Sequence, residues 1–218
     1  TNPGRHISLG GTGTGSRVEA KNGDVTLIGT GRATGRENYG IQLNGGGQVR
    51  AGRDIIMTGI GGPEFETPND RAEGIRAESG SIIESTGDGV NKISLTADEI
   101  TLQGEGVVAG VGDILMLQPR QANLSILVGG ASENNIVDNT SEQLHLSTSD
   151  LSALEEGFSR ISIGEINESS TVPLIRIVRD DSFRDSVFQD PLELKADIID
   201  TLGDAVILGV DDASITLI

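Results

Sequence analysis

Short segments of similar sequence recur along the first 130 residues, and this repetition constrains the fold more than any other feature. Gly40–Leu43 reads Gly-Ile-Gln-Leu, and Gly74–Ala77, 34 residues later, reads Gly-Ile-Arg-Ala. Two further copies, Gly15–Gly31 and Asn91–Gly106, share one order: a short alternating strand, a polar turn, a second alternating strand and Gly-x-Gly. A repeat of this length predicts an array in which each unit stacks on the next.

The expected strands within these repeats are short and alternate aliphatic with polar residues. Val25–Leu27, Ile93–Leu95 and Ile100–Leu102 each place a Thr or Ser between two aliphatic side chains. One face of such a strand is apolar and the other polar, which is typical of a half-buried β-strand. The sequence therefore predicts an all-β fold, a parallel β-helix or β-solenoid whose coils stack and whose aliphatic side chains form ladders.

Glycine supports this interpretation, because 27 of the 31 glycines lie in residues 1–130. We expect glycine at the corners between strands, where a positive φ disfavours most other residues. The five aromatic residues, with no Trp among them, suit a narrow interior that admits Ile, Leu and Val. The segment Pro63–Asp70 is expected to loop out of one coil.

Composition divides the chain into two regions, 1–130 and 131–218. The first is rich in glycine and carries a net charge of −4, whereas the second carries −13 of the total −17. The second region keeps the strand pattern, so we predict that it is an acidic continuation of the solenoid. Its clearest expected strands lie within Leu192–Ile198, Asp204–Gly209 and Ala213–Leu217.

One segment of the second region departs from the strand pattern. Residues 150–157 begin with Asp150 as a potential N-cap, space apolar residues three apart and end at Gly157. These features predict a single short helix. Just before it, His145 alternates with two leucines, so its side chain is expected to point outward from a strand.

Several kinds of site are disfavoured by composition. The absence of Cys excludes disulfides, zinc fingers and thiolate nucleophiles, and two distant histidines, His6 and His145, argue against a multi-histidine metal site. A net charge of −17 argues against a nucleic-acid partner. No stretch reaches the ~18 apolar residues of a membrane span. No signal peptide follows Thr1–Arg5, and the chain stops within a strand-like pattern at Ile215–Ile218, so we interpret it as a mature form or a piece of a longer protein.

Three segments resemble a known family. Leu27–Gly31, Asn38–Leu43 and, most specifically, Leu144–Gly164 are similar to the filamentous-haemagglutinin-type β-helix repeats of large exported proteins of Gram-negative bacteria, cyanobacteria included. In Leu144–Gly164 a strand, an acidic helical turn and Gly-Phe-x-x-Ile-x-Ile-Gly follow one another. The resemblance extends to about Val178, and it implies an exported right-handed β-solenoid used as a stalk, adhesin or matrix component, with no shared catalytic residues.

The resulting expectation is a non-enzymatic structural or adhesive segment, secreted to the bacterial cell surface, with a surface glycan or protein receptor as a possible partner. A first alternative is a subunit of an extracellular filament that forms by end-to-end stacking of coils. A second is a polysaccharide-active β-helix enzyme, which the shortage of aromatic residues for sugar stacking disfavours. No catalytic or cofactor-binding residue is predicted.

The acidic stretch after Val178 has no family counterpart, and it leaves two interpretations open. Clustered carboxylates could bind calcium, although neither the Gly-Gly-x-Gly-x-Asp nonapeptide nor an EF-hand loop is present. The alternative, which we favour, is a solvated acidic face that keeps the protein soluble. The residues concerned are Asp180, Asp181, Asp185, Asp190, Asp211 and Asp212.

Overall fold

The structure is a computed structural model, and it describes residues 6–10, 15–31, 38–62, 73–105, 107–130, 143–167, 170–179, 185–211 and 213–218. The expected loop Pro63–Asp70 lies outside these residues. Nearly all of the described regular structure is β, with one helical turn, α1 (Thr148–Leu151). The described strand pairs are parallel, apart from one antiparallel pair. The prediction of an all-β fold with parallel strands is confirmed.

Three parallel sheets contain most of the strands. The first consists of β1 (Ile7–Leu9), β4 (Ile41–Leu43), β7 (Ile75–Ala77) and β10 (Ile100–Leu102). The second consists of β2 (Arg17–Ala20), β5 (Gln48–Ala51), β8 (Ile82–Ser85) and β11 (Val108–Ala109). The third consists of β3 (Val25–Thr30), β6 (Ile55–Ile60), β9 (Lys92–Thr96), β12 (Ile114–Gln118), β15 (Arg160–Ile163), β19 (Leu192–Leu194) and β22 (Ile215–Leu217).

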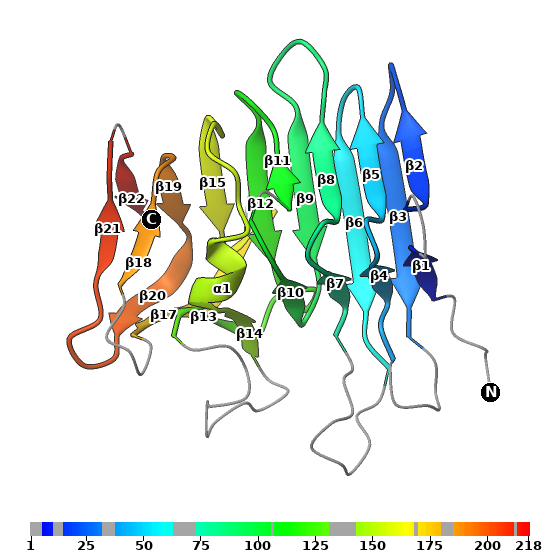
Figure 1. Cartoon of the computed structure of the whole chain (residues 1–218). Helices are drawn as coiled ribbons and strands as arrows, with labels where there is room; N and C mark the ends of the chain where they lie inside the picture. Colours follow the sequence, from blue (N-terminus) through cyan, green and yellow to red (C-terminus); the bar gives the residue numbers. More distant parts are fainter. Residues whose placement is uncertain are drawn as a thin grey trace.

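The chain visits the first, second and third sheets in a fixed order, and we call one such passage a round. The strands β1, β2 and β3 form the first round, and three further rounds lead to β12. Each strand pairs with its equivalent in the preceding round. The colours in Figure 1 therefore run in sequence order across the molecule, from blue at β2 and β3 to green at β12.

After β12 the third sheet continues, whereas the first two sheets give way to smaller ones. The five-stranded sheet contains β14 (Gln143–Leu146), β13 (Ser125–Gly129), β17 (Ser170–Val178), β16 (Glu165–Asn167) and β20 (Ala196–Thr201). The two-stranded sheet contains β18 (Ser186–Phe188) and β21 (Ile207–Gly209). Because β15, β19 and β22 extend the sheet that β3 begins, one sheet includes strands from both compositional regions, 1–130 and 131–218.

The core consists of ladders of aliphatic side chains. Equivalent residues on neighbouring strands are in register and are buried except in the outermost strands, so each round adds one rung to each ladder. Burying one such side chain contributes about 1.5–3 kcal/mol, and the stabilisation is spread along the molecule. One ladder of the third sheet contains Val25, Ile55, Ile93, Leu115, Ile161 and Leu192.

The register confirms one sequence repeat and corrects another. Ile41 of the Gly-Ile-Gln-Leu segment is the Cα partner of Ile75, 34 residues later. The match of Asn91–Gly106 to Gly15–Gly31 is out of phase, because the first strand of the later copy, β9, belongs to the third sheet and its second, β10, starts a new round. Both sheets use the same aliphatic–polar–aliphatic pattern, so the strand sequences do not reveal which sheet each strand joins.

Glycine has two structural roles, of which the sequence predicted one. Gly46 and Gly80 lie at equivalent corners with φ of 82° and 81°, as expected. Gly29 and Gly59 do not lie at positive-φ corners, because both lie within strands and face each other in register. A Cβ at Gly59 would collide with the carbonyl oxygen of Gly74. These two glycines therefore permit a close approach between the third and first sheets.

The helix begins earlier than predicted and is shorter. Its N-cap is Ser147, and Asp150 lies in its first turn instead of at the cap. The two residues form a capping box, in which each side chain accepts a hydrogen bond from the other's backbone N–H. This reciprocal arrangement is more favourable than a single Asp cap, so the start moves to Ser147. No helix in the described ranges is long and apolar enough to cross a membrane.

Candidate functional site

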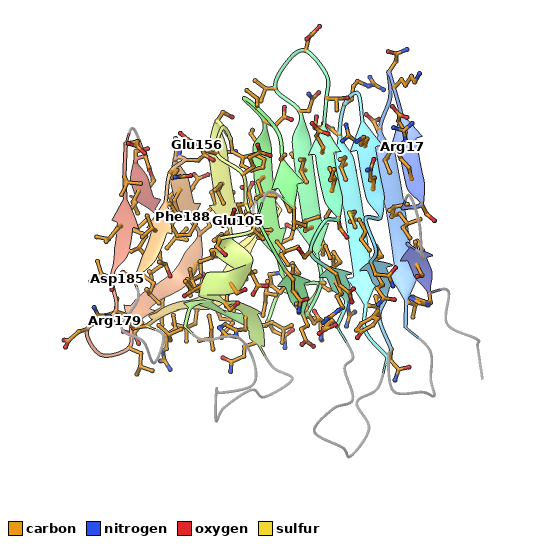
Figure 2. The ribbon with its side chains drawn as sticks, in the orientation of Figure 1. Arg17, Glu105, Glu156, Arg179, Asp185 and Phe188 are labelled. Carbon is orange, nitrogen blue, oxygen red and sulfur yellow. The ribbon has the colours of Figure 1, made fainter. Side chains whose placement is uncertain are left out.

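The acidic residues proposed for calcium do not converge where the structure describes them. Both carboxylate oxygens of buried Asp190 accept the Gly157 N–H, at 2.9 and 3.1 Å, so the expectation of a solvated side chain is wrong for this residue. Asp185 pairs with Arg179 at 3.2 Å (Figure 2), and Asp211 is exposed. The other three, Asp180, Asp181 and Asp212, lie outside the described residues. The described part of the chain holds no group of three or more potential metal ligands.

Other aspartates connect neighbouring rounds at the starts of third-sheet strands. The Asp24 carboxylate accepts the N–H of Asp54, whose own carboxylate accepts the N–H of Lys92 at 2.8 Å. Asp113 accepts the N–H of Asn91 at 2.7 Å. These carboxylates satisfy backbone donors at the turns between strands. This role was not predicted from the sequence, although Asp directly before an aliphatic strand residue recurs at Asp24, Asp54 and Asp113.

Three residue types of the hydrolase triad lie close in sequence at His145, Ser147 and Asp150. His145, which alternation places on the outward side of its strand, is nevertheless buried, and its Nε2 lies 2.8 Å from the carbonyl oxygen of Gly129. The Ser147 hydroxyl donates to Asp150 at 2.6 Å. In a triad the serine would donate to the imidazole instead. The cluster therefore fixes the chain around α1, and Ser147 is held as a helix cap.

A buried ion-pair cluster surrounds Arg76 on β7. Its guanidinium donates to Glu73 at 2.9 Å and to Glu78 at 3.1 Å, and it lies 5.5 Å from the centre of the Tyr39 ring. Burial acts to lower the pKa of Arg76, but the two carboxylates outweigh it and hold the pKa above its usual value. Sequence inspection missed this cluster, although Glu73 and Glu78 lie only three and two residues from Arg76, because the local sequence does not show that Glu73 and Arg76 are buried. Its close packing and hydrogen bonding indicate a structural role.

A second charged cluster joins β15, β16 and the end of β19. Lys195 lies 2.8 Å from Glu165 and 3.4 Å from Glu193, and Glu193 pairs with Arg160 at 2.9 Å. Burial acts to raise the pKa of Glu165, but the hydrogen bond and charge of Lys195 outweigh it and lower the pKa below its usual value. The alternating charges tie the β16 segment to the outer face of the third sheet.

Two shallow grooves flank the turn that contains Glu155 and Glu156. One, of about 330 Å³, runs past Glu84 and Val111, and the other, of about 230 Å³, runs past Phe188 (Figure 2). Glu84 is already paired with Arg50 at 2.6 Å. A sugar-cleaving site needs two carboxylates at a fixed separation, usually beside exposed aromatic rings for sugar stacking. The described aromatic residues Tyr39, Phe158 and Phe188 are all buried.

Most of the exposed large aliphatic side chains in the described ranges lie near the C-terminal end of the chain. We call the surface formed by β20, β21 and β22 the C-terminal end face. Its strands are the outermost strands of their sheets among the described residues, and Figure 1 places them together at one extremity of the molecule. An apolar surface of this kind, next to strand edges, marks an interaction site. Its exposed aliphatic residues are Ile198, Leu202, Val206, Leu208, Val210, Ile215, Leu217 and Ile218.

Comparison of the chain with family models, curated proteins and solved structures found no match in any of the three. The candidate sites are therefore ranked by geometry alone. The polar clusters at Asp150, Arg76 and Glu165 are each held by hydrogen bonds and ion pairs within the chain, and they stabilise the fold. Among the described residues, the C-terminal end face combines the largest number of exposed large aliphatic side chains with strand edges, so it is the best candidate for a functional contact.

Proposed function

We propose that this chain is a non-enzymatic structural or adhesive segment of an exported bacterial surface protein, built as a stiff right-handed β-solenoid. The observation that carries this proposal is the seven-stranded parallel third sheet, to which each successive round contributes one strand. A chain that returns to the same sheet after visiting two others, four times in the same order, is what a solenoid requires. The resemblance of Leu144–Gly164 to filamentous-haemagglutinin-type repeats supplies the exported, adhesive context.

The stiffness of the proposed solenoid follows from the direction of its hydrogen bonds. Backbone bonds between rounds run along the long direction of the sheet, and the buried ladders run beside them. A load along this direction is shared by several parallel sheets. At about 4.8 Å per interstrand step, the seven strands of the third sheet extend about 29 Å, so a long shaft needs further rounds from the same or another chain.

Surface labelling of intact source cells tests the proposed location, and attachment tests the adhesive role. Antibodies raised against the chain should label intact cells as strongly as permeabilised ones. Beads coated with the chain should bind a glycan or protein surface and lose that binding after thermal unfolding. Labelling restricted to permeabilised cells would contradict the proposal. Release of reducing ends from a panel of polysaccharides would instead support the enzyme alternative.

The second candidate is a subunit of an extracellular filament, which one observation favours. The core ladders of the third sheet remain exposed at the C-terminal end face, where a further round would bury them. A filament and a surface stalk share the same solenoid, and they differ in whether separate copies of the chain associate. Electron microscopy distinguishes them, because a filament subunit gives fibres of indefinite length and a stalk segment gives particles of one length.

A further inference from the structure

The C-terminal end face exposes residues that are fully buried one round earlier. Leu192 and Leu194 are 1% and 0% exposed, whereas their partners Ile215 and Leu217 are 38% and 58% exposed. Among the described residues, these two ladders end at Ile215 and Leu217. Burying two such aliphatic side chains against a further round would stabilise a contact by removing apolar surface from water.

Strand β22 also has backbone groups directed at its outer edge. Leu192 donates to the Ser214 carbonyl at 2.8 Å, and Ile218 donates to the Leu194 carbonyl at 2.9 Å. Since consecutive residues of a parallel strand bond in opposite directions, the N–H and C=O groups of Ile215 and Leu217 point away from β19. No described strand pairs with this edge. It can therefore accept a parallel strand.

The first round presents the matching edge. Val25 donates to the Asp54 carbonyl at 2.9 Å, so its backbone groups face β6 and those of Thr26 face the outer edge of β3. Val25–Leu27 and Ile215–Leu217 share the order aliphatic–Thr–aliphatic, and they are the first and last rungs of the same two ladders. With Val25 opposite Ile215, the outward backbone groups of Ile215 and Leu217 can therefore bond with those of Thr26.

Charge at the adjoining turns is complementary as well. The turn between β2 and β3 carries exposed Lys21, and the turn between β21 and β22 carries exposed Asp211. If β3 of one copy lay beside β22 of another, these two turns would be neighbours. Asp24, in the same turn as Lys21, is already paired with Arg53. A symmetric contact of two C-terminal end faces would leave the Asp211 turn without this lysine.

We propose that the C-terminal end face binds the first round of a second copy of this chain, head to tail, with Val25 opposite Ile215 and Leu27 opposite Leu217. The proposal rests on the solenoid of the proposed function and names its partner. An unrelated apolar partner would cover the side chains but would leave the edge groups of Ile215 and Leu217 unbonded. Because the two contacting surfaces differ, the contact does not close, and copies add into filaments.

Sedimentation velocity of the 218-residue chain over a wide concentration range tests this inference. We expect species larger than the monomer that grow with concentration. Leu217→Lys places a charge in the contact and should leave only monomer. Val111→Lys, at an exposed aliphatic residue far from both end faces, should associate like the unmutated chain. A chain that stays monomeric at every concentration would overturn the inference.

Complementation of two blocked chains tests the head-to-tail geometry. Thr26→Pro removes an edge N–H from β3 without breaking a bond inside the chain, and Leu217→Lys blocks only the other end. Each variant alone should be monomeric, whereas their mixture should give one-to-one dimers through the two intact faces. Dimers of either variant alone would show a symmetric contact and refute the proposal. Circular dichroism reports whether each variant is folded, and Leu27→Lys, which places a charge opposite Leu217, replaces the proline variant if that variant unfolds.

The head-to-tail contact and the proposed function can fail independently of each other. A monomeric chain whose antibodies still label intact cells overturns only the head-to-tail contact. Association without surface labelling contradicts the exported role and leaves the contact standing.

Discussion

The Asp150 carboxylate accepts the backbone N–H of Leu102 at 2.7 Å, across 48 residues of sequence. Leu102 lies on β10, the last strand of the first sheet. No described strand pairs with the outer edge of β10 in that sheet. A side chain at the start of α1 thus occupies the position where a further strand would bond. Ser147 donates to the other oxygen of the same carboxylate. One buried carboxylate therefore ends a sheet and caps a helix.

Replacing Asp150 tests this double role. In Asp150→Ala, the N–H groups of Leu102 and Ser147 lose their acceptor while they stay buried, so the free energy of unfolding should fall by about 2–3 kcal/mol. Urea denaturation measures the change. Asp204→Ala removes an exposed carboxylate and should leave the stability nearly unchanged. Equal losses in the two variants would show that the contact with Leu102 is unimportant.

Removing Arg76 should be among the most destabilising substitutions on the surface of the first sheet. Arg76→Met leaves the buried Glu73 carboxylate without the guanidinium, which costs about 3–5 kcal/mol for a broken buried pair. Arg53→Met breaks an exposed pair with Asp24 and should cost less than about 1 kcal/mol. Thermal and urea unfolding of both variants provide the comparison. A similar small loss for both would contradict the buried cluster.

Because the pKa of Glu165 is lowered, the protein should lose part of its stability in acid. Because Lys195 lowers the pKa of folded Glu165 below its ordinary value, the pair stabilises the fold fully above that ordinary value, about 4.5. The stabilisation is lost as the pH falls through the lower, folded-state pKa. Glu165→Gln should therefore reduce stability at neutral pH and flatten its decline in acid. Glu155→Gln, at an exposed carboxylate, should leave the pH profile as it is.

Because Gly59 is closely packed, alanine should destabilise the protein at Gly59 but not at Gly23. A Cβ at Gly59 would strike the Gly74 backbone, so Gly59→Ala should destabilise by about 1–3 kcal/mol through overpacking. A Cβ at Gly23, which lies in a turn, would meet no atom within 4 Å, so Gly23→Ala should be neutral. Chemical denaturation of the two variants measures the difference. A neutral Gly59→Ala would mean that the two sheets are not in contact there.

The ladders could be predicted from sequence, because an in-register parallel array repeats the same local pattern. Gly40–Leu43 and Gly74–Ala77 resemble each other for the same reason that Ile41 lies on Ile75: both residues occupy one position of successive rounds. The phase of Asn91–Gly106 could not be predicted in this way. Its strands satisfy the same alternation in any of the sheets, and only the pairing of Ile93 with Ile55 assigns them.

The polar interior was not predictable, because it depends on contacts between rounds. Alternation placed His145 outward, yet it is buried, and the Gly129 carbonyl provides a hydrogen-bond partner. Asp190 looked like part of a charged surface, but Gly157, 33 residues earlier, lies within hydrogen-bonding distance. Burial of a polar side chain depends on such distant partners, which a local pattern does not contain.

The most direct test of the central claim is the distance between spin labels at Thr26 and Thr216. Both side chains are exposed on the third sheet, and the chain has no cysteine to interfere with labelling at Thr26→Cys and Thr216→Cys. The two strands are six interstrand steps apart, so pulsed electron–electron double resonance should give one narrow distance near about 29 Å, with labelled protein diluted into unlabelled chain. A much shorter distance, or a broad distribution, would contradict the stacked parallel rounds.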